Sequence, residues 1–206
     1  MARPLHNAAS MRTRRGFTLV ELMIVVAIVG ILAALALYGL RRYQQYASTG
    51  EATAMLQGMR GKQENFRAEN LTYAGCNAGG FNLGGAALGD NDLYPRGLGA
   101  LDDRKRSWDE VAPGTPLGQC FRAVGVRSDG PVRFGYGMTA GNAGQPIVTN
   151  PKSGGATFTR PYNAITPAEP WYILIAIGDR DDDNAAFARL SAISLQNEVY
   201  MEDETE

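Results

Sequence analysis

A long apolar run near the N-terminus most constrains the structures open to this chain. Residues 17–40 contain one charged side chain, that of Glu21, and residues 22–40 contain none. A helix of this length measures roughly 36 Å at about 1.5 Å per residue, which is enough to cross a hydrocarbon core about 30 Å thick. The run therefore predicts one membrane-spanning helix.

The residues before this run are basic. Residues 1–16 contain four arginines and no acid, and positively charged flanks of a membrane helix usually stay in the cytoplasm. We therefore expect a single-pass membrane protein with its N-terminus inside and its C-terminus outside.

The charge balance and the histidine content argue against two broad function classes. The chain has 20 Lys+Arg and 21 Asp+Glu, without the basic surplus typical of nucleic-acid-binding domains, so we predict no direct nucleic-acid binding. The only histidine, His6, lies before the apolar run. Histidine-based triads and zinc sites are therefore poorly supplied, and we predict that the protein is not an enzyme.

Three interpretations of the N-terminal segment are open. A secretory signal peptide would be cut after Ala36, at the end of an A-x-A match, and would release a globular domain that begins at Leu37. An uncleaved anchor explains the length of the run but not Glu21, because a carboxylate in lipid costs roughly 2.5–3.5 kcal/mol. The third interpretation gives that carboxylate a partner.

The third interpretation rests on the letters GFTLVE at residues 16–21 and the apolar residues that follow. This segment resembles the class III signal of type IV pilins and of type II secretion pseudopilins. The resemblance implies that a prepilin peptidase cuts between Gly16 and Phe17 and that the new amino group of Phe17 is methylated. Leaders in that family are short, so we expect translation to start at Met11 and the leader, residues 1–16 as numbered here, to be removed.

The chemistry of this cut explains an acid in the apolar run. Cleavage before Phe17 creates an ammonium group that would lie in apolar surroundings after assembly, where an unpaired charge is costly. Glu21 follows one helical turn later, so its carboxylate can neutralise the amine of its own subunit or of the next one. The family resemblance favours the contact between subunits.

The resemblance also implies the partners and the location. It implies a structural subunit of a homo-oligomeric helical filament, stored in the inner membrane and assembled with a prepilin peptidase, an inner-membrane platform protein and an assembly ATPase. The filament would be either a cell-surface pilus that serves adhesion, twitching motility or DNA uptake, or a periplasmic pseudopilus that drives protein export.

The rest of the chain predicts an α+β fold. Residues 41–70 continue the helix as an amphipathic segment, because Met55, Met59 and Phe66, with Leu56 beside them, recur at helical spacing. Residues 71–206 form a globular head that begins with a Gly-rich loop. The long helix would pack against an antiparallel sheet of this head, as in the pilin fold.

Four segments of the head are predicted strands. Residues 121–127 and 132–138 flank the turn residues 128–131 and read as a hairpin. Residues 171–177 form a continuous apolar run typical of a buried strand, and residues 187–200 form one final strand. Between the Gly-rich loop and the hairpin, the mixed charges of residues 102–106 predict a solvated turn.

The two cysteines lie outside the membrane in this topology. Disulfides persist in such oxidising surroundings, so we expect Cys76 and Cys120 to pair, the alternative being two buried thiols. In the chain-entropy model, closing this loop contributes about 4 kcal/mol.

One acidic segment suggests a structural cation. Asp179, Asp181 and Asp183 alternate in a turn, and oxygen ligands of this kind suit Ca²⁺, although the remainder of an EF-hand loop is absent. Calcium-stabilised loops in some pseudopilins support the same hypothesis by resemblance. The alternative is a solvated turn without a cofactor, and thermal unfolding unchanged by a chelator or by added Ca²⁺ would favour it.

Overall fold

The apolar run begins a helix that continues well beyond it. A computed structural model of the chain describes residues 16–97, 101–102, 104–109, 114–147, 152–153, 156–157, 165–179 and 187–202. Its first helix, α1, runs over Leu19–Asn70, which confirms the predicted continuous helix. α1 ends where the next residue, Leu71, adopts a left-handed backbone with φ of 62°, a conformation that stops a helix.

An antiparallel sheet and a short helix follow α1, so the α+β prediction is confirmed. The sheet has the order β2-β1-β3-β6-β7-β8, and its neighbouring strands all pair antiparallel. Its strands are β1 (Cys76–Asn77), β2 (Gly80–Phe81), β3 (Gly135–Gly141), β6 (Trp171–Gly178), β7 (Ala188–Ile193) and β8 (Val199–Glu202). The short helix is α2 (Pro116–Ala123), and a separate two-stranded sheet pairs β4 (Lys152–Ser153) with β5 (Ala156–Thr157).

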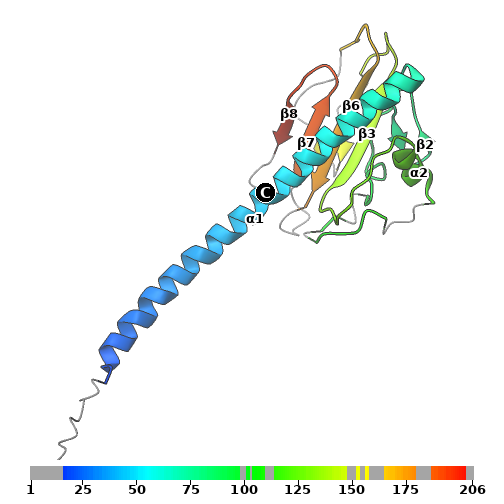
Figure 1. Cartoon of the computed structure of the whole chain (residues 1–206). Coiled ribbons are helices and arrows are strands. Elements are labelled where there is room, and N and C mark those ends of the chain that lie inside the picture. Colours follow the sequence, from blue (N-terminus) through cyan, green and yellow to red (C-terminus); the bar gives the residue numbers. More distant parts are fainter. Residues whose placement is uncertain are drawn as a thin grey trace, which may run out of the picture. The chain divides into compact units, whose positions relative to one another are not determined.

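The second half of α1 supplies one layer of the head. Residues 44–206 form one compact unit, which we call the head, and within it α1 lies against the sheet (Figure 1). Leu56 and Met59 are fully buried, and Met55 and Phe66 pack partly buried against the same core. The predicted apolar stripe and its cover by the sheet are therefore confirmed.

The sheet is buried on both faces. Alternate residues of β6 enter two cores: Tyr172, Leu174 and Ala176 pack in the core beneath α1, whereas Trp171, Ile173, Ile175 and Ile177 pack in a second core with Leu88, Leu93, Leu101 and Ile147. A strand buried on both faces reads as a continuous apolar run, so the predicted strand over residues 171–177 is confirmed. In β3, Gly141 makes room for the indole, because an added Cβ would lie 2.6 Å from the Trp171 ring.

The predicted strand over residues 121–127 was wrong. Its first residues belong to α2, which begins at an N-cap, Thr115, whose hydroxyl accepts a hydrogen bond from the Gly118 N–H, and which has Pro116 in its first turn. The helix stops at Gly125, whose φ of 78° is left-handed. Thr-Pro at the start and glycine just past the end are ordinary helix boundaries, and they outweigh a short run of apolar residues. Of the two strands in the predicted hairpin, only the second, predicted over residues 132–138, is present. It lies three residues later, as β3.

The single final strand predicted over residues 187–200 is two strands, β7 and β8. The turn between them is bound by α1, because the Arg60 guanidinium donates to the carbonyls of Gln196, Asn197 and Glu198 at 2.9, 2.9 and 3.0 Å. An arginine presents five donors in a fixed fork, so one side chain satisfies three carbonyls that the ladder leaves unpaired.

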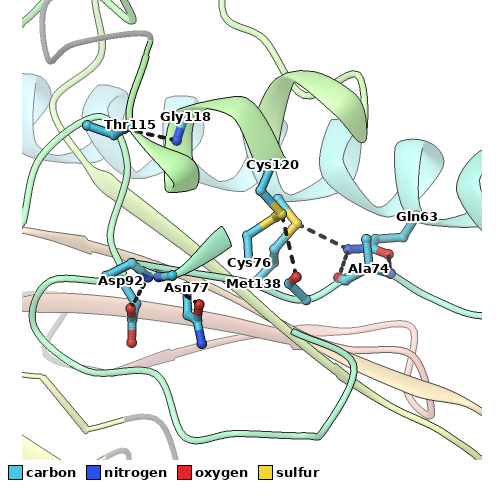
Figure 2. The surroundings of a disulfide bond; sticks show 12 residues. Gln63, Ala74, Cys76, Asn77, Asp92, Thr115, Gly118, Cys120 and Met138 are labelled. Carbon is cyan, nitrogen blue, oxygen red and sulfur yellow. Dashed lines mark hydrogen bonds between the residues drawn. A yellow bond between two sulfur atoms is a disulfide. The ribbon is translucent and has the colours of Figure 1, made fainter. Parts of the chain in front are cut away.

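A buried amide joins α1 to the segment that begins the sheet. The Gln63 side chain donates to the Ala74 carbonyl at 2.7 Å and accepts from the Ala74 N–H at 2.9 Å, so it pairs with the backbone as a neighbouring strand would (Figure 2). Gln63 has no exposed surface. Its amide therefore satisfies two backbone groups that water cannot reach.

The prediction that residues 102–106 are a solvated turn was wrong for Asp102. This carboxylate pairs with the buried Arg96 and accepts from Arg106 at 2.7 Å and from the Arg104 N–H at 3.1 Å. Burial alone would raise the pKa of Asp102, but the hydrogen bonds from Arg106, Arg96 and the Arg104 N–H outweigh it and lower the pKa to about 2. Arg96 also donates to the Arg133 carbonyl at 2.8 Å. The Asp102–Arg96 pair therefore connects the loops beside β3.

Replacing Gln63 by leucine should destabilise the head. Gln63→Leu leaves the buried N–H and carbonyl of Ala74 unpaired, so we expect the free energy of unfolding to fall by about 1–3 kcal/mol. Denaturant unfolding of the full chain in detergent, followed by near-ultraviolet circular dichroism, measures this free energy. Gln57→Leu, a change at an exposed glutamine of the same helix, is the matched control, and equal stability of the two variants would contradict the role of Gln63.

Protonation of Asp102 at low pH should lower the stability of the head. A carboxylate whose pKa is lowered by folding stabilises the folded state above its unfolded pKa, and this stabilisation disappears as the pH falls through the folded pKa. The change from 3.8 to about 2 corresponds to about 2 kcal/mol, lost between pH 5 and pH 2. Denaturant unfolding across that range should show a shallower pH dependence in Asp102→Asn than in wild type or in Asp129→Asn, an exposed control. Identical pH dependence in all three would contradict the assignment.

Candidate functional site

The N-terminus of α1 is closed by two side chains that bind each other. The Thr18 hydroxyl accepts from the Glu21 N–H at 3.2 Å, and Glu21 Oε2 accepts from the Thr18 N–H at 3.1 Å and from the Thr18 hydroxyl at 2.9 Å. This reciprocal arrangement is a capping box, which satisfies backbone donors that the first helical turn leaves unpaired. It fixes the Glu21 carboxylate at the start of the helix, against the N–H of the Phe17–Thr18 peptide.

Thr18 is the residue that the sequence reasoning missed. Glu21 was singled out as the one acid of an apolar run, but its local partner was not. The signal was present, because Thr and Glu three residues apart before an apolar run is the capping-box pattern.

The capping box leaves part of the carboxylate for another donor. Within the described residues, every hydrogen bond of Glu21 uses Oε2. Oε1 therefore remains available to a cation such as an amino group. The site can thus cap its own helix and bind a positive charge at the same time.

The residues at the expected cut are exposed in the single chain. Gly16 and Phe17 precede the helix, and Phe17 is 79% exposed. A Cβ built on Gly16 would meet nothing within 4 Å. The described fold therefore does not itself require glycine at this position, so a requirement for it would come from a molecule that binds the extended backbone.

In the first half of α1, none of the side chains that the structure describes is buried. Residues 1–43 form the other compact unit, and residues 16–40 are all exposed. Among the described residues, α1 is the one helix long and apolar enough to cross a membrane, with a mean hydropathy of 2.8 over its most apolar 18 residues. An apolar surface of this extent needs lipid or protein to cover it.

The structure brings the two cysteines of the head together. Cys76 in β1 and Cys120 in α2 form a disulfide with Cα atoms 5.8 Å apart and a sequence separation of 44 (Figure 2). It links α2 to β1, the second strand of the sheet, close to the Gln63–Ala74 pair (Figure 2). The Gly-rich segment expected as a loop is thereby anchored, and it also contains the short strands β1 and β2.

The acidic segment proposed for calcium is described in part. Asp179 follows β6 and is 1% exposed, whereas Asp181 and Asp183 lie outside the described residues. In the part of the chain that the structure describes, no group of three His, Cys, Asp or Glu side chains could hold a metal ion. The calcium site stays a prediction.

Comparisons with known proteins find similarity that includes the N-terminal segment. A family model described as the prokaryotic N-terminal methylation motif matches residues 11–37. The chain is 36% identical over 89 residues to the type IV major fimbrial protein FimA of Dichelobacter nodosus, covering 43% of this chain and 53% of that protein. It is 45% identical over 60 residues to the type IV major pilin protein PilA of Myxococcus xanthus, covering 29% of this chain and 27% of that protein.

A third relative is a fimbrial protein of Moraxella nonliquefaciens, which is 48% identical over 64 residues that cover 31% of this chain and 42% of that protein. The matches to these three relatives thus cover between about a quarter and a half of their lengths.

Proposed function

We propose that this chain, a member of the type IV pilin family by its N-terminal methylation motif, is a structural subunit that polymerises into a pilus filament. The single observation that carries this proposal is the first half of α1, which is apolar and exposed from its first turn to residue 40. Lipid would cover this surface before assembly, and neighbouring copies would cover it afterwards.

Processing by a prepilin peptidase between Gly16 and Phe17 is the proposed first step. The cut would break the peptide bond by hydrolysis and leave an amino group on Phe17, which is then methylated. Exposure of both residues and the absence of any steric need for glycine at position 16 within the described fold support this step. Processing would remove the arginines of the leader, three of which lie in residues 11–16, the charges that we expect to hold the precursor with its N-terminus in the cytoplasm.

Glu21 is the proposed assembly residue. Its Oε2 caps the helix and its Oε1 is open to a second donor, so the carboxylate can neutralise the Phe17 amine of a neighbouring subunit without losing the cap. The pair would lie in an apolar environment, where an unpaired charge costs several kcal/mol. Matched pairing of each amine with the next carboxylate would then favour one axial register.

The remaining partners follow from this role. A membrane-stored subunit that is added to a filament needs an inner-membrane platform and an energy source, for which we propose a platform protein and an assembly ATPase. The role is structural rather than catalytic. The fimbrial and pilin names of the relatives favour a surface pilus over the type II secretion pseudopilus that the sequence alone leaves open.

Three variants should separate capping from charge neutralisation. Glu21→Gln keeps an acceptor for the capping box but removes the charge, Glu21→Val removes both, and Thr18→Ala weakens only the cap, which costs about 1 kcal/mol. We expect all three to insert, but Glu21→Gln and Glu21→Val to give at least about tenfold fewer filaments, because an unpaired buried amine costs about 3–5 kcal/mol. Thr18→Ala should assemble almost normally.

The measurement is the ratio of sheared surface filament to membrane-bound subunit on immunoblots. Normal filament yield from Glu21→Gln would contradict the neutralising role. A loss of filaments in Thr18→Ala equal to that in Glu21→Gln would show that capping alone accounts for the effect.

A further inference from the structure

A cleft lies beside the C-terminal end of α2. It has a volume of about 440 Å³ and is lined by Trp108, Asp109, Arg122, Gly125, Val126 and Arg127. The left-handed Gly125 ends α2 and turns the chain, which places the two arginines on either side of it in sequence. We call this feature the α2 cleft.

The α2 cleft carries an excess of positive charge. Asp109 pairs with Arg122 at 3.0 Å and with Arg127 at 3.9 Å, and both arginines remain largely exposed, at 51% and 73%. The Lys62 ammonium of α1 lies close by, 4.0 Å from where a Cβ on Gly125 would be. Among the described side chains here, three cations therefore face one carboxylate, and their exposed N–H groups suit an anionic ligand.

Two buried donors lie at or close to the cleft. The indole N–H of Trp108, which lines the cleft, and the hydroxyl of Tyr94, which lines another pocket, make no hydrogen bond with the described part of the chain, and the two rings meet edge to face at 5.0 Å. Burial and nearby Asp109 raise the pKa of Tyr94, so its hydroxyl keeps its proton and stays a donor. Buried polar groups are rarely left unpaired, and the Trp108 indole N–H, which lines the cleft, suits a carboxylate oxygen to which it can donate.

The opposite edge of the sheet ends in an acidic segment. β8 is the edge strand, and Glu202 at its end is buried and pairs with Arg189 at 3.8 Å. Residues 203–206 follow with the sequence Asp-Glu-Thr-Glu. The charges of this segment thus complement those of the α2 cleft.

The cleft and the start of the acidic segment belong to different parts of the head. α2, which borders the cleft, packs against β1 and β2, whereas β8, which precedes the segment, is the strand at the opposite edge of the sheet (Figure 1). A contact between the two charged surfaces can therefore join adjacent copies.

We propose that the α2 cleft of one subunit binds the acidic segment 203–206 of the next subunit in the filament. The inference rests on the proposed function. Because the two surfaces differ and lie at opposite edges, the contact is heterologous, and such contacts repeat into open helical assemblies instead of closing a dimer. It connects neighbouring heads, whereas the Glu21 contact connects neighbouring helices.

Charge reversal on both sides tests the contact in the full-length protein expressed in cells. The cleft variant carries Arg122→Glu and Arg127→Glu, the segment variant carries Asp203→Lys, Glu204→Lys and Glu206→Lys, and the swap variant carries all five changes. We expect about tenfold less sheared filament from the first two and recovery to within about twofold of wild type in the swap variant. Arg104→Glu, at an exposed arginine of the head, controls for added negative charge and should assemble normally.

The results separate this contact from the proposed function. If wild type forms no filament, the proposed function itself fails. If wild type polymerises but the separate reversals have no effect, or the swap variant does not recover, the head contact is overturned.

A second measurement uses wild-type filaments, so it tests the contact even if the variants do not reach the membrane. A carbodiimide joins amines to carboxylates in direct contact, so wild-type filaments should yield dimers and longer multimers in which Lys62 is linked to an acid of residues 203–206. Filaments in which Lys62 reacts only with acids of its own chain would overturn the contact.

Discussion

Burial of one stripe of α1 under the sheet is the contact on which the head depends. Leu56 and Met59 fill the core between the two layers. Apolar contacts alone would not fix the position of the sheet against the helix, and polar residues beside them add directional contacts. Gln63 pairs with the backbone at Ala74, and Arg60 holds the turn between β7 and β8. Packing supplies most of the stability, and these hydrogen bonds select one position of the sheet against the helix.

The sequence predicted the features that depend on periodicity, and it missed those that depend on local boundaries and distant partners. The stripe of α1 and the strand at 171–177 were readable because their patterns extend over many residues. α2 was mistaken for a strand because its apolar residues are few, although Thr115 and Gly125 mark its ends. The break between β7 and β8 could not be read locally, because its turn is held by Arg60, more than a hundred residues away.

The candidate sites also contain features that the sequence predicted and features that it missed. Glu21 was recognisable because an acid in an apolar run is costly, and the cysteine pair because the predicted topology places both residues outside the membrane. The capping box with Thr18 shows that Glu21 has a local role in a single chain, so a charge-neutralising role between subunits has to be distinguished from it. The α2 cleft needed the fold, since Lys62, Trp108 and Arg127 come from three separate segments.

The most direct test of the account is the mass of the mature N-terminus. We propose that the exposed apolar helix is freed by cleavage after Gly16 and kept as the assembly element. Mass spectrometry of the subunit from sheared filaments should then find a chain that begins with N-methylated Phe17. A chain that begins at Leu37 would mean that the helix had been removed as a secretory signal, and it would contradict assembly through α1.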